Sequence, residues 1–70
     1  MMPLALAQIG EENTVKRIGG RPEVRKHLET LGFVVGGSVT VVTSLGGNVI
    51  VNVKDSRIAI SEEMARKIMV

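Results

Sequence analysis

Residues 30–53 contain no Asp, Glu, Lys or Arg, and this uncharged stretch constrains the fold more than any other feature of the sequence. Its length would suffice for a transmembrane helix, because about 20 apolar residues cross a bilayer. However, polar residues alternate with valines in steps of two, and glycine pairs occur at 36–37 and 46–47. A step of two is the period of a β-strand, and a helix would place Asn48 and Asn52 in lipid without hydrogen-bond partners. The stretch therefore predicts two strands joined by a turn.

The composition also favours a mostly-β domain. Val, Ile and Thr (11, 6 and 4 residues) make up 21 of the 70 residues, whereas Ala and Leu together make up 9. Side chains branched at Cβ fit a pleated strand and lose rotamer freedom in a helix. A chain of this length allows one domain, and we expect residues 1–70 to form it. Because the chain has no cysteine, disulfides and cysteine-based zinc sites are excluded.

One helix is expected over Pro22–Leu31. Its apolar face has the spacing i, i+3, i+4 and i+7, with Val24, His27, Leu28 and Leu31. Pro22 suits the first helical position, because its missing N–H has no partner there in any case. Gly32 suits the left-handed position after the helix, and Phe33 is expected to fold back on the last turn.

The strands are predicted to be short and joined by tight turns. We expect them at residues 14–18, 38–44, 49–53, 57–60 and 68–70. Ser61 is expected to cap a brief helix before the last of these. Such a small sheet best hides its two edges by curling into a barrel. The predicted fold is therefore a mostly-β, small SH3-like barrel of about five strands, with one helix after the first strand and a short helical turn before the last.

The sequence offers little for catalysis. It has one histidine and no cysteine, so it lacks the nucleophile and base pairs of hydrolases, and we expect no enzyme. The apolar residues 1–9 lack the basic start and cleavage site of a secretion signal, and we expect a cytoplasmic protein. For metal binding, only Glu23 and His27 lie one helical turn apart, and two ligands would hold ferrous iron or another divalent ion weakly. His27 is otherwise expected at the rim of the core.

Positive charge is concentrated near the helix. Residues 16–27 carry five cations against Glu23 alone, a net charge of +4, and the cations are Lys16, Arg17, Arg21, Arg25 and Lys26. Such a patch is typical of a solvated face or of a surface that steers an acidic protein. With Leu31 and Phe33 as apolar rim residues, it is the predicted partner-binding surface. Nucleic acid binding is disfavoured, because Phe33 is the only aromatic side chain available for stacking on bases.

The order of these features resembles the FeoA family over essentially the whole chain. The most specific motifs are the helix end Leu28-Glu29-Thr30-Leu31-Gly32-Phe33 and the closing segment from Ile58-Ala59-Ile60 through Glu63-Met64-Ala65 to Ile68. Between them stand the strand Ser38-Val39-Thr40-Val41 and the turn Gly46-Gly47-Asn48.

The resemblance implies an SH3-like barrel among small bacterial proteins of the ferrous iron transport system. It implies an accessory that assists or regulates the FeoB transporter through that transporter's cytosolic GTP-binding part, and that reaches the membrane only through this partner. The family supplies no catalytic residues to carry over. Related domains accompany a winged helix and a metal site in metal-dependent repressors, and these 70 residues have neither. A nucleic-acid-binding barrel and a weak binder of ferrous iron remain the alternatives.

Overall fold

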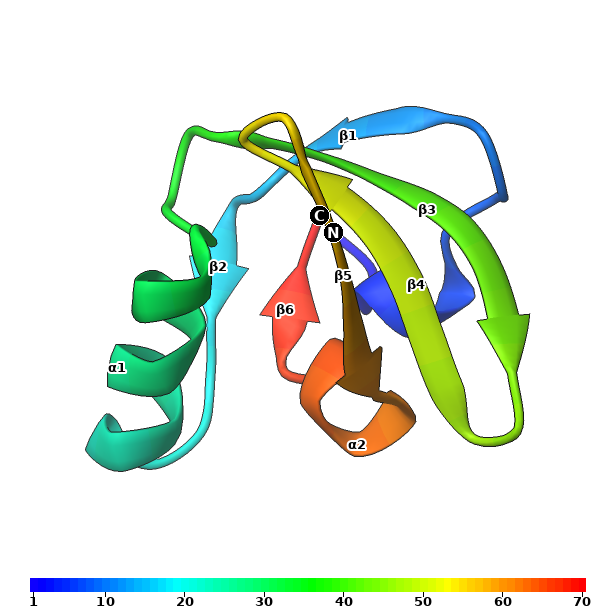
Figure 1. The fold of residues 1–70 in the computed structure, drawn as a ribbon. Coiled ribbons are helices and arrows are strands. Elements are labelled where there is room, and N and C mark those ends of the chain that lie inside the picture. Colours follow the sequence, from blue (N-terminus) through cyan, green and yellow to red (C-terminus); the bar gives the residue numbers. More distant parts are fainter.

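The computed structural model describes residues 1–70 and shows a mostly-β fold with six short strands and two α-helices (Figure 1). A single turn of 3-10 helix precedes them. In chain order the elements are η1 (Leu4–Leu6), β1 (Glu12–Thr14), β2 (Arg17–Ile18), α1 (Pro22–Leu31), β3 (Ser38–Leu45), β4 (Asn48–Val53), β5 (Ser56–Ser61), α2 (Glu62–Ala65) and β6 (Ile68–Met69).

The strands form two antiparallel sheets. One has four strands in the order β1-β3-β4-β5, and the other pairs β2 with β6. Two-residue turns at 46–47 and 54–55 connect the consecutive strands of the larger sheet, and all four turn residues have positive φ between 48° and 83°. Turns of this hand match the twist of paired strands, and glycine adopts them without strain. The paired-glycine hairpin expected from the sequence is confirmed.

The strand expected over residues 14–18 is in fact two strands. The Val15 N–H donates to the carbonyl of Gly37 at 2.8 Å, whereas the Lys16 N–H donates to the carbonyl of Met69 at 2.8 Å. The chain therefore leaves β3 and joins β6 between Val15 and Lys16. This change of partner explains why the core residues Val15 and Ile18 do not alternate strictly. The predicted fold class is confirmed, with α1 after the first strands and α2 before the last.

The core is a single cluster of 13 buried hydrophobic residues and contains no polar side chain. Alternation predicts most of it correctly, because every second residue of β4 is buried, at Val49, Val51 and Val53. Val39 and Val41 of β3 are buried in the same way. The two helices and the N-terminal turn close the cluster with Leu28, Ala65 and Leu4.

Helix α1 has the predicted bounds, Pro22–Leu31, and ends as its sequence indicates. Gly32 has φ 112°, and its N–H donates to the carbonyls of Leu28 and Glu29. The Phe33 N–H donates to the carbonyl of Leu28 at 3.0 Å. This pair of bonds is the C-terminal cap that a left-handed glycine allows, and it turns Phe33 back beneath the helix.

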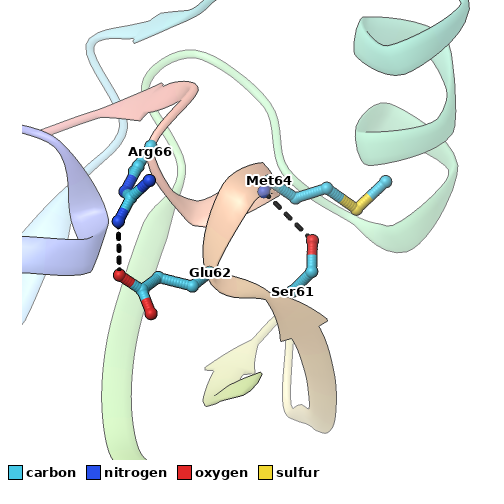
Figure 2. A network of polar contacts seen from close by, with 4 residues as sticks. All are labelled: Ser61, Glu62, Met64 and Arg66. Carbon is cyan, nitrogen blue, oxygen red and sulfur yellow. Dashed lines mark hydrogen bonds and ion pairs between the residues drawn. The ribbon is translucent and has the colours of Figure 1, made fainter. Parts of the chain in front are cut away.

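Helix α2 is short and held by polar contacts at both ends (Figure 2). The Ser61 hydroxyl accepts a hydrogen bond from the Met64 N–H at 3.1 Å, which confirms the predicted cap. Arg66 pairs with Glu62 at 2.7 Å, one turn apart on the exposed side. The Glu62 N–H also donates to the carbonyl of Gly47 at 3.0 Å, which fastens α2 to the β3–β4 turn.

The two ends of the chain lie side by side (Figure 1). The N–H of Met2 donates to the carbonyl of Val70 at 2.9 Å, and the N–H of Val70 donates to the carbonyl of Met2 at 2.8 Å. Pro3 pairs with Met69, so the N-terminal residues extend the small β2–β6 sheet by one more edge. None of the helices has the length and apolar character needed to cross a membrane.

Candidate functional site

The five cations singled out in the sequence lie on or next to β2 and α1, two elements at one end of the molecule (Figure 1). All five side chains are exposed, and together they are called the basic face, comprising Lys16, Arg17, Arg21, Arg25 and Lys26. Lys16 immediately precedes β2, Arg17 begins it, and Arg21 is the N-cap of α1. The connection between β2 and α1 is only three residues long, residues 19–21, so the strand and the helix are adjacent in the chain.

No carboxylate forms an ion pair with the basic face. The one ion pair of the chain joins Arg66 to Glu62, and no other carboxylate oxygen lies within 4.0 Å of a cationic nitrogen. Residues 16–27 carry five positive charges and one negative charge, a net +4. Because the whole chain carries +2, the remaining residues carry −2. Counted over the whole of β2 and α1, residues 16–31 also include Glu29 and carry a net +3, so the positive charge is concentrated there and the remaining residues carry −1.

The packing of α1 exposes these cations. Leu28 is its only fully buried residue, and Val24 and Leu31 are half-buried against the core. Successive helical residues are rotated by about 100°, so Lys26 lies opposite this narrow buried stripe and Arg25 lies on its flank. His27 was predicted at the rim of the core, and this prediction is wrong, because the buried stripe is too narrow to cover it and the imidazole is exposed.

A sixth cation adjoins the basic face and could not be found by reading the sequence locally. Lys67 precedes β6, and its carbonyl accepts a hydrogen bond from the Gly19 N–H at 2.7 Å. A Cβ added at Gly20 would lie 2.9 Å from Cδ of Lys67. The lysine stem therefore crosses Gly20, next to Arg21. The only signal for this contact is the pairing of β2 with β6, which joins residues far apart in the sequence.

The apolar part of the predicted surface needs one correction. Phe33 is 0% exposed, because the C-terminal cap of α1 turns its ring into the core, so it cannot touch a partner. Leu31 is half-buried and remains at the rim. Val35, which the sequence reading missed, is 66% exposed. The Gly36 N–H donates to the carbonyl of Val15 at 2.8 Å. This bond places residues 34–37, here called the valine turn, beside the start of β2.

The metal candidates Glu23 and His27 are both exposed and lie one turn apart on α1. No group of three or more His, Cys, Asp or Glu side chains is close enough to hold one ion. A two-ligand site on a helix surface leaves most coordination positions of a transition metal to water. The pair therefore offers weak coordination at most.

The molecule has one surface depression, on the four-stranded sheet. It has a volume of 450 Å³ and is lined by polar residues only, namely Glu12, Ser38, Thr40, Asn52, Lys54 and Asp55. Arg57 on β5 donates from Nε to Oδ1 of Asn52 at 3.2 Å, beside this depression. The depression contains no histidine and no apolar wall, and no side-chain hydrogen bond joins its two hydroxyls, Ser38 and Thr40, to its carboxylates or its lysine.

A family model, a named relative and two solved structures point to the same family. The FeoA domain matches residues 2–70. A protein of Methanocaldococcus jannaschii, provisionally named Fe(2+) transport protein A, is 40% identical over 70 residues, which is 100% of this chain and 85% of the relative. A crystal structure of an iron uptake regulatory protein (FeoA) is 30% identical with a TM-score of 0.90, over 99% of this chain and 92% of the other. The solution structure of the FeoA protein from Chlorobium tepidum is 27% identical with a TM-score of 0.86, over 97% of this chain and 67% of the other.

Proposed function

The chain belongs to the FeoA family, and from this premise we propose that it is a non-enzymatic, cytosolic accessory of ferrous iron uptake that binds the GTP-binding part of a FeoB-type membrane transporter. The observation that carries the proposal is the match to the FeoA domain over residues 2–70. The name of the relative from Methanocaldococcus jannaschii, which refers to Fe(2+) transport, supports the same pathway.

The basic face is the proposed contact surface. Its cations have no internal partner, so their field reaches outward and would attract an acidic protein surface over about one Debye length, roughly 8–10 Å at moderate salt. Exposed charges mainly accelerate and orient the encounter, whereas buried apolar contacts hold the complex. Leu31 and Val35 supply apolar area beside the cations, and we propose that they are covered in the complex.

A pull-down with the soluble GTP-binding domain of the transporter tests this function. The experiment is run without nucleotide, with GDP and with a non-hydrolysable GTP analogue. We expect binding in at least one of the three states, and a difference between them would show regulation by nucleotide. Absence of binding in all three states would contradict the proposal.

Two double variants locate the surface. Arg21→Glu with Arg25→Glu reverses two charges of the basic face, and we expect it to abolish capture at moderate salt. Arg57→Glu with Arg66→Glu changes the net charge by the same amount on β5 and just after α2, and we expect it to bind like the natural chain. Equal loss in both variants would mean that overall charge, and not the basic face, determines binding.

A further inference from the structure

The four-stranded sheet has a second side that the core does not use. Val49, Val51 and Val53 of β4 are buried in the core, so by alternation Ile50 and Asn52 between them point to the other side of the sheet. The strand order β1-β3-β4-β5 extends this side across four strands (Figure 1). It is called the outer face, and it shares no residue with the basic face, which lies on or next to β2 and α1.

One row of side chains across the outer face ends in opposite charges. Glu12 pairs with Thr40, Thr40 with Asn52, and Asn52 with Arg57, so the row crosses all four strands. Neighbouring strands lie about 4.8 Å apart, which separates the Cα atoms of Glu12 and Arg57 by about 14 Å. The two side chains therefore make no ion pair within the chain. Nε of Arg57 donates to Oδ1 of Asn52 at 3.2 Å, which leaves both terminal nitrogens of the guanidinium for another acceptor.

An apolar row runs beside the charged one. Ile50 pairs with Thr43 on β3 and with Ala59 on β5. Val42 is the additional residue where the register of β3 and β4 shifts. Val42 and Ile50 are half-buried, yet neither packs against the core, and Leu45 at the end of β3 is 72% exposed. The outer face is therefore apolar at its two central strands and charged at its two edge strands.

We propose that two copies of this chain pack through their outer faces, related by a two-fold axis that runs along the strands between β3 and β4. This rotation reverses the strand order, so β1 of one copy lies over β5 of the other, and β3 lies over β4. Glu12 of each copy then meets Arg57 of the other, and this contact occurs twice in the dimer. Val42 meets Ile50 in the same way, and the exposed aliphatic groups cover each other.

The other charged residues near the outer face are compatible with this arrangement. Lys54 and Asp55 form the turn between β4 and β5, which the rotation places over the end of β1, at the uncharged Thr14. Glu11 precedes β1, and alternation directs it away from the outer face. Glu12 lines the 450 Å³ depression of this sheet, which gives the long Arg57 side chain of the second copy room to enter.

The size of the outer face determines how strongly two copies associate. Four strands of about five residues, about 4.8 Å apart with 3.3 Å per residue, cover roughly 15–20 Å in each direction. Two such faces bury roughly 800–1,000 Å² in total, which is at the lower limit of specific interfaces. We therefore expect a weak and reversible dimer. This inference goes beyond the proposed function, because it assigns a surface that the transporter is not proposed to contact.

Sedimentation equilibrium of the natural chain tests the dimer without any transporter. Interference optics are needed, because the chain has no Trp or Tyr. The average mass should rise from 7.5 kDa towards twice that value between about 10 µM and about 1 mM chain. A mass that stays at 7.5 kDa up to the highest concentration would overturn the proposal. Growth beyond the dimer would also overturn it, because a two-fold contact uses up the face.

A charge exchange locates the interface. Arg57→Glu and Glu12→Arg each bring like charges together in both contacts, and each should weaken the dimer by about tenfold or more. The combined variant restores opposite charges in reversed order and should dimerise within about threefold of the natural chain. Both proteins carry the same net charge of +2, so total charge cannot explain a rescue.

Arg25→Glu is the matched control, because it changes the net charge as Arg57→Glu does but lies on α1. It should dimerise like the natural chain. Equal loss in Arg25→Glu, unchanged association in Arg57→Glu, or a loss that the combined variant does not reverse would each refute the assignment. Circular dichroism checks that every variant is folded. The transporter pull-down tests a different surface with a different partner, so either proposal can fail alone.

Discussion

Replacing Phe33 with alanine tests whether this residue belongs to the core or to a contact surface. Its side chain is 0% exposed and is the largest fully buried one in the chain. Removal of a buried phenylalanine costs about 3–5 kcal/mol of unfolding free energy. A domain of this size has a total stability of roughly 4–10 kcal/mol, so the variant should lose a third or more of it. The melting temperature should fall by more than 10 °C, at about 4–8 °C per kcal/mol.

Urea unfolding followed by circular dichroism measures this change, because the chain has no Trp or Tyr to report by fluorescence. Val35→Ala is the matched control, since it removes an aliphatic side chain two residues away that is 66% exposed. It should change stability by less than about 0.5 kcal/mol. If Phe33→Ala costs less than 1 kcal/mol, or no more than Val35→Ala, the placement of the ring in the core is wrong.

Four further predictions address the helix ends and the alternative functions. Gly32→Ala should lower stability by about 1–2 kcal/mol in the same unfolding assay, because φ is 112° there; a neutral result would contradict the left-handed cap. Ser61→Ala should cost about 1 kcal/mol through loss of the Met64 N–H bond, and an unchanged urea midpoint would deny the cap a role. Calorimetric titration with ferrous iron should give the same weak signal for the natural chain and His27→Ala, whereas loss of a one-to-one isotherm in the variant would identify His27 as a ligand. Titration with RNA or DNA at about 150 mM salt should show no saturable binding, and saturable binding there would revive the nucleic-acid alternative.

Sequence patterns within a few residues predict a helix, strand or turn correctly where nearby interactions alone determine it. Pro22 and Gly32 mark the two ends of α1, and the structure places the helix between them as expected. Alternating valines give β3 and β4 and tell which residues are buried. The turn at 46–47 follows from its glycine pair, because both residues have positive φ. In each case the interactions that decide the structure lie within a few residues of one another.

Contacts between residues far apart in the sequence cannot be predicted from such local patterns. The division of the first strand depends on Met69, which accepts a hydrogen bond from Lys16 more than fifty positions earlier. Lys67 reaches the basic face only because β6 pairs with β2. Neither residue carries a local pattern that distinguishes it from an ordinary surface position.

The five cations of the predicted surface are exposed, whereas Phe33, one of its two apolar residues, is buried. The exposure of the five cations follows from the cost of burying an unpaired charge, which holds in any fold. Whether an apolar residue just after a helix is buried or exposed depends instead on the geometry of the C-terminal cap. Phe33 lies at the position that folds inward, and Val35, two residues later, lies on the surface.

Backbone amide chemical shifts, followed by NMR while the soluble GTP-binding domain of the transporter is added, test the central claim most directly. The account predicts that the largest shifts and broadening fall within residues 16–35, on β2, α1 and the valine turn, and that Thr40 and Asn52 on the four-stranded sheet stay unchanged. Shifts centred on Thr40 and Asn52, or no shifts at a partner concentration that saturates the pull-down, would contradict it.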